Sequence, residues 1–184
     1  MVHISKELKQ AIEEMPNKEK NTLLIRLIRK DWMLVQQLEF KLLGGEAIKA
    51  EKKEIILNRI DNYSFYNNTP GWLMMDLRDF SGDITRYYKV TKDKQGEVEL
   101  LLKLLINGME KPMEMLKTQQ HRADKFAEYT VKKALTVLEK INKLHEDLHI
   151  EFEADMNTLL QLIYSYPPTQ IMAKEMALPR EFEI

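Results

Sequence analysis

Apolar residues recur along this chain at intervals of three and four, the spacing that places them on one face of an α-helix. Glycine and proline mark most of the boundaries between these periodic stretches. The pattern predicts helices over residues 5–15, 18–43, 46–62, 71–80, 97–107, 112–143 and 150–164. The fourth helix extends toward residue 88 if Ser81–Asp83 does not interrupt it, and one docked helical turn follows Pro167-Pro168. Ser5 is a suitable N-cap for the first helix, and Gly44 is suited to end the second.

No stretch of the chain predicts a β-sheet. Residues 87–91 have suitable side chains, but a lone strand cannot satisfy its own backbone. Helices joined by short turns favour antiparallel neighbours, so we expect an all-α fold of antiparallel helical hairpins packed as a bundle or a short α-solenoid. The expected organisation is one all-helical domain over residues 1–184, with 1–62 and 70–184 as possible sub-units joined by the loop 63–69.

Composition excludes several classes of protein. The 28 Lys and Arg residues nearly balance the 29 Asp and Glu residues, so the net charge of -1 creates no overall attraction to nucleic acid or to an anionic membrane. The absence of cysteine excludes disulfides, thiol catalysis and thiolate metal sites. The first residues lack the apolar segment of a signal peptide, and no apolar run approaches a membrane span. We therefore expect a cytoplasmic protein.

The layout of the helices also supports a comparison with known domains. Residues 4–9 form an Ile-Ser-Lys-Glu-Leu-Lys opening, Pro16-Asn17-Lys18-Glu19 leads into an apolar helix at 23–27, and helix pairs follow around 96–97 and 134–135. This layout resembles a bacterial family of all-helical domains of unknown function with repeat-like packing. The resemblance covers most of the chain and lies in layout and spacing. It implies a stack of helical hairpins and carries over no catalytic residue.

The segment from His145 to His149, with the sequence His-Glu-Asp-Leu-His, is the stretch whose pattern predicts chemistry. On a continuous helix the two histidines would lie one turn apart on one face, where they can hold one Zn²⁺ beside Glu146 as a general base. Glu153 or Asp155 could supply a third ligand. A zinc-dependent hydrolase is therefore one alternative.

Three features of the same region argue against zinc. Asp147 places a charge within a motif whose zinc-peptidase examples resemble one another in having uncharged residues there. No sheet edge is available to align a peptide substrate. A continuous helix over 112–164 would be unusually long, and a chain reversal near Glu146 would destroy the spacing. Without zinc, we expect His145 to be a half-buried helix residue and His149 to lie on the surface near a helix end. We expect no metal site and no catalytic residue in this segment. The sequence leaves open whether residues 145–149 form one helical turn or a corner between two helices.

A second alternative comes from the basic residues Arg26, Arg29 and Lys30, which with Trp32 and Lys41 could form a face that contacts phosphates. Acidic residues are interspersed with them and can pair with them along the helix. The pattern therefore favours a solvated face of mixed charge, and weak nucleic-acid binding is kept as an alternative.

The densest group of aromatic and methionine residues lies at 63–75. Such residues are enriched in recognition surfaces, and they also fill cores beneath loops. Within this group we expect Tyr66, Trp72 and Met75 to contact a partner. The sequence as a whole favours a non-enzymatic protein without a cofactor, which acts through protein–protein interaction or self-association.

Overall fold

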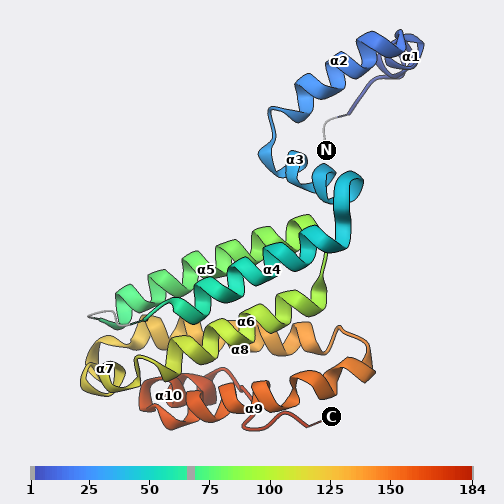
Figure 1. Ribbon diagram of the computed structural model, residues 1–184. Coiled ribbons are helices and arrows are strands. Elements are labelled where there is room, and N and C mark those ends of the chain that lie inside the picture. The colour runs from blue at the N-terminus through green and yellow to red at the C-terminus, as the bar shows by residue number, and fades with distance from the viewer. Residues whose placement is uncertain (1–2, 66–68, 184) are drawn as a thin grey trace. The chain divides into compact units, whose positions relative to one another are not determined.

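A computed structural model describes residues 3–65 and 69–183, and every regular element within these ranges is a helix (Figure 1). The all-α class is therefore confirmed. The chain divides into two compact units, residues 1–45 and residues 46–184, which we call unit 1 and unit 2. This division falls at Gly45, whereas the sequence suggested 63–69 as a possible junction. None of the helices in the described ranges has both the length and the apolar character needed to cross a lipid bilayer.

Unit 1 consists of short helices. They are α1 (Lys6–Glu14), α2 (Asn17–Ile28), α3 (Trp32–Glu39) and a π-helical turn (Phe40–Gly44). The Ser5 hydroxyl accepts a hydrogen bond from the amide of Leu8 at 3.2 Å, so the predicted N-cap of the first helix is confirmed.

The single helix predicted over 18–43 is wrong. Asp31 has an extended backbone (φ -123°, ψ 100°), and its carboxylate accepts a hydrogen bond from the amide of Leu34 at 3.1 Å. A short acidic side chain competes for backbone amides in this way, which ends one helix and starts the next. The expected stop at Gly44 is also wrong, because helical backbone continues from the π-helical turn into the following helix.

Unit 2 contains the longer helices. They are α4 (Gly45–Asn62, which begins at the boundary), α5 (Pro70–Thr91), α6 (Lys94–Glu110), α7 (Met113–Thr118), α8 (Asp124–Ile141), α9 (His149–Ser165) and α10 (Pro167–Glu175). Helix α5 runs through Ser81–Asp83 without interruption. The helix predicted over 112–143 is divided in two, because a 3₁₀ turn (Gln120–Arg122) separates α7 from α8.

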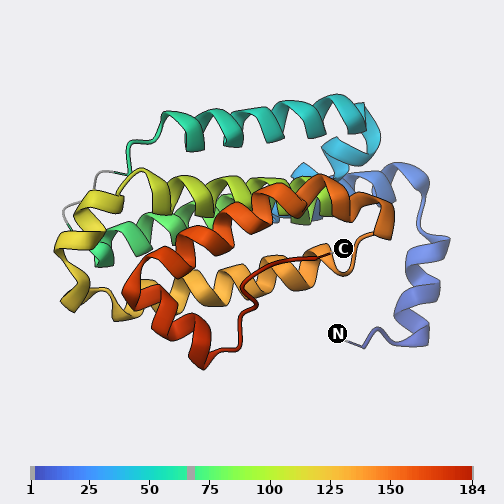
Figure 2. The same cartoon turned by 90° about the horizontal axis from the view of Figure 1, so that it is seen from below.

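Helices α5, α6, α8 and α9 pack against one another, and α10 packs on α8 and α9 (Figure 1). Figure 2 shows the same helices from below, lying side by side. Helix α4 is tied to α5 by a 2.5 Å hydrogen bond from Arg59 to Asp83, and to α6 by a 3.1 Å ion pair between Lys103 and Asp61. Side chains from α4 to α10 form one continuous core, as expected of a helical bundle.

Gly108 shows why α6 does not stop where the sequence suggested. The glycine is buried and helical, and α6 continues to Glu110. A Cβ atom on Gly108 would lie 2.5 Å from a methyl carbon of Leu77 on α5. The missing side chain therefore lets α5 and α6 approach closely, a packing role that the predicted helix end at residue 107 did not anticipate.

Candidate functional site

The segment from His145 to His149 is a corner between two helices. Helix α8 ends at Ile141, His145 has an extended backbone (φ -65°, ψ 142°), a 3₁₀ turn covers Glu146–Leu148, and α9 begins at His149. The Nδ1 atom of His145 lies 3.4 Å from the backbone nitrogen of Asp147 and 3.2 Å from its carboxylate. The histidine side chain therefore caps the turn, and the two histidines do not share one helical face.

The environments of the two histidines are the reverse of the expected ones. The side chain of His145 is 75% exposed, and Glu146 is exposed beside it. His149 is partly buried, its ring centroid lies 6.3 Å from that of Phe182, and its Nε2 atom is buried without a hydrogen-bond partner. Within the described ranges, no three His, Asp or Glu side chains lie close enough together to hold a metal ion, and this includes Glu153 on α9. The zinc alternative therefore has no geometric support here.

The aromatic and methionine group at 63–75 contains some side chains that are buried in the core and others that are exposed on the surface. Phe65 and Leu73 are fully buried, whereas Trp72 is 66% exposed and Met75 is 45% exposed. Trp72 and Met75 lie about one turn apart near the start of α5, which Thr69 caps. Both therefore lie where a partner can reach them, while Tyr66 falls outside the described residues.

Unit 1 holds a larger apolar surface that sequence reasoning missed. None of residues 3–45 is buried. Large apolar side chains at least 36% exposed occur throughout the unit: Ile4, Leu8, Ile12, Leu24, Ile25, Leu27, Trp32, Leu42 and Leu43. The apolar periodicity predicts these helices, but periodicity alone does not distinguish a stripe packed in a core from an exposed one. Within unit 1, these side chains are not covered by one another.

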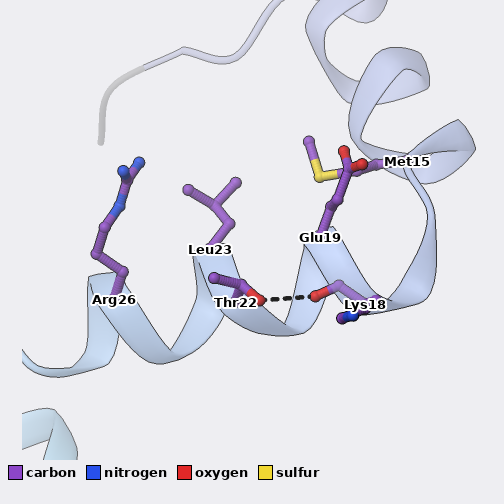
Figure 3. Close-up of a pocket in the computed structure, with 6 residues that line it drawn as sticks. All are labelled: Met15, Lys18, Glu19, Thr22, Leu23 and Arg26. Atoms are coloured by element: carbon purple, nitrogen blue, oxygen red, sulfur yellow. Dashed lines mark hydrogen bonds between the residues drawn. The ribbon is translucent and has the colours of Figure 1, made fainter.

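Unit 1 also has two grooves, one with a mixed lining and one with an apolar lining. One, of about 520 Å³, is lined by Met15, Lys18, Glu19, Thr22, Leu23 and Arg26. Figure 3 shows that Glu19, Leu23 and Arg26 extend to the same side of α2, with Met15 approaching from the end of α1. The other, of about 270 Å³, is apolar and is lined by Ile28, Val35, Leu38, Glu39, Leu42 and Leu43. The second offers a depression into which apolar side chains of a partner can insert, and the first combines two apolar side chains with charged groups.

The basic residues of the nucleic-acid alternative are exposed in the structure. Arg26 lines the first groove together with Glu19, while Arg29 and Lys30 lie at the break before the Asp31 cap. Acidic and basic groups therefore alternate on this surface. Nucleic-acid binding stays an untested prediction.

No family model matches the chain, and neither the curated proteins nor the solved structures contain a significant match to it.

Proposed function

We propose that this protein is a non-enzymatic interaction protein that associates with a second copy of itself through the apolar surface of unit 1. The observation that carries the proposal is the absence of any buried residue between positions 3 and 45, although the helices there carry regular apolar stripes. Unit 2, in contrast, buries its apolar residues in a continuous core. A helix with an exposed apolar stripe gains stability when another surface covers that stripe.

The area of this surface is sufficient for an interface. The exposed parts of the nine large apolar side chains present on the order of 900 Å², which is close to the ~800 Å² that each partner contributes to a standard interface. Apolar burial is worth about 25 cal/mol per Å² before the costs of association are subtracted, so covering these side chains supplies a driving force for association.

The charges that accompany the apolar residues favour a second copy as the partner. Lys9 pairs with Glu13 at 3.7 Å on α1, and Lys18, Glu19 and Arg26 surround the first groove. A surface that carries both signs of charge beside its apolar residues can be complementary to an identical surface turned through a two-fold axis. A nucleic-acid partner would instead favour a surface of one sign.

Trp72 and Met75, together with Tyr66, are the second proposed contact. Their support is the exposure of Trp72 and Met75 on the first turns of α5, since aromatic and methionine side chains are common anchors of interfaces. This contact lies within unit 2 and is tested separately from unit 1.

Sedimentation velocity on the full chain tests the proposal over concentrations up to about 100 μM. The wild type is expected to form dimers, and the double variant Leu24→Glu, Leu27→Glu is expected to dissociate at least about tenfold more easily, because carboxylates would have to be buried at the interface. Both leucines are at least half exposed, so circular dichroism should show unchanged helicity.

The matched control is the double variant Ile150→Glu, Ile171→Glu. It makes the same chemical change at exposed isoleucines of unit 2, and it should leave the association constant unchanged. A wild-type chain that stays monomeric over the whole range would contradict self-association. Equal weakening by both double variants would contradict the assignment of the interface to unit 1.

A further inference from the structure

A small groove on unit 2 has a chemical character different from that of the unit 1 surface. It lies between α5 and α8, has a volume of about 280 Å³, and is lined by Arg78, Ser81, Gly82, Thr85, Tyr129 and Lys133. The four α5 residues follow helical spacing and share one face, and the two α8 residues lie one turn apart. No lining residue is acidic.

The two cations of this groove differ from most of their neighbours in having no ion pair. Within the described ranges, no carboxylate oxygen lies within 4.0 Å of Arg78 or Lys133. The adjacent Lys132, in contrast, pairs with Glu128 at 2.5 Å, and Lys140 pairs with Glu97 at 2.7 Å. The groove therefore concentrates positive charge that the fold does not neutralise directly.

This arrangement disfavours the charged form of Lys133. Burial lowers the pKa of its ammonium group, and the nearby charges of Lys140 and Arg78 lower it further, while Glu97 opposes them. The Lys133 ammonium also lies 5.8 Å from the centre of the Tyr129 ring. An anion placed between Arg78 and Lys133 would relieve the repulsion between the cations.

Hydroxyl groups complete the lining. The Ser81 and Tyr129 hydroxyl oxygens are 2.9 Å apart, and the Tyr129 hydroxyl lies 3.2 Å from the Leu77 carbonyl, to which it can donate. The Thr85 hydroxyl donates to the Ser81 carbonyl at 2.8 Å, so it is already engaged. The remaining donors are the forked guanidinium of Arg78 and the ammonium of Lys133, a combination suited to the oxygens of a phosphate group.

We propose that this groove between α5 and α8 binds a small oxyanion with the chemistry of a phosphate group, held by Arg78 and Lys133. The groove is small, about 280 Å³, and its two cations are enough to hold one phosphate group. Two kinds of ligand carry such a group: inorganic phosphate and a phosphate monoester.

The test is a titration of the full chain with inorganic phosphate, and separately with O-phosphoserine, at constant ionic strength set with sodium chloride. Binding is followed by ³¹P line broadening and by the melting temperature. We expect saturation with a dissociation constant on the order of 1 mM, and at least tenfold weaker binding in Lys133→Gln and in Arg78→Gln. The matched control Lys132→Gln lies on the same helix but outside the groove, and it should bind as the wild type does.

Thr85→Glu is a second variant that does not disturb the core, because Thr85 is exposed at the groove. Its carboxylate can occupy the position of the anion, so it should also weaken binding at least tenfold. Tighter binding of O-phosphoserine would identify a monoester as the ligand, and saturation by inorganic phosphate alone would identify the free ion. No saturation by either compound up to about 20 mM, or equal weakening in Lys132→Gln, would overturn the proposal.

Discussion

Replacing Phe65 with alanine should lower the free energy of unfolding by about 3–5 kcal/mol, the usual range for a fully buried aromatic residue. The Phe65 side chain is 0% exposed, and its ring centroid lies 4.8 Å from that of Tyr63 in an edge-on arrangement and 5.9 Å from that of Phe80. The backbone of Phe65 has a positive φ of 52°, which packing of the ring must offset. Alanine would keep that strained backbone and leave a cavity.

Urea denaturation followed by circular dichroism measures this loss, with Trp72→Ala as the control. Trp72 belongs to the same aromatic group and is larger than Phe65, but it is 66% exposed, so its replacement should change the free energy of unfolding by no more than about 0.5 kcal/mol. Equal losses in the two variants would mean that Trp72 is part of the core, and the proposed contact at Trp72 and Met75 would then be wrong.

Replacing Lys140 with methionine should cost about 2–3 kcal/mol of folding free energy, because it leaves the Glu97 carboxylate buried without its ion-pair partner. Glu97 lies in the first turn of α6 with its side chain 8% exposed, and Lys140 on α8 donates to it at 2.7 Å. The Lys140 ammonium also lies 5.4 Å from the centre of the Tyr88 ring. Partial exposure of Lys140 and the charge of Lys133 near Glu97 keep the loss below that of a fully buried pair.

The double variant Glu97→Leu, Lys140→Met distinguishes two contributions to the loss of stability: the missing ion pair itself and the buried charge left without a partner. Two apolar side chains of similar size can replace a buried ion pair with little change in stability, so the double variant should recover most of the loss. Both are measured by chemical denaturation against the wild type. A double variant as unstable as Lys140→Met would show that the contact stabilises α6 against α8 in some other way.

Hydrophobic periodicity was sufficient to place several helices. Helices α4, α6, α9 and α10 lie within a few residues of their predicted positions, and two of them carry a local start signal, the Asp93 cap of α6 and Pro167 in the first turn of α10. The breaks at Asp31 and at residues 119–123 were missed for different reasons. Trp32 and Val35 continue the apolar pattern directly after Asp31, and the hydrogen bond of the Asp31 carboxylate ends the helix against that pattern. Residues 119–122 are all polar, which is also what an exposed face of one continuous helix would carry.

Burial could not be predicted in the same way, because it depends on which distant segments pack together. Leu24 and Leu101 both belong to regular apolar stripes, yet Leu24 is 55% exposed and Leu101 is 4% exposed. The groove on unit 2 was missed for a related reason. Arg78 and Lys133 come from helices far apart in the sequence, and only the packing of α5 on α8 brings them together.

We propose that unit 2 folds around its own core, whereas the helices of unit 1 gain their stability from a second copy of the chain. Short helices without buried contacts open readily in water, so their amide protons exchange quickly unless a partner covers them. Association by mass action would slow that exchange as the protein concentration rises.

Hydrogen–deuterium exchange on the full chain, at two concentrations about fiftyfold apart that bracket the dimer dissociation constant, tests this claim most directly. The predicted result is rapid exchange in α1, α2 and α3 at the low concentration and clear protection at the high one, with α5, α6 and α9 protected at both. Strong protection of residues 3–45 that does not change with concentration would contradict the claim.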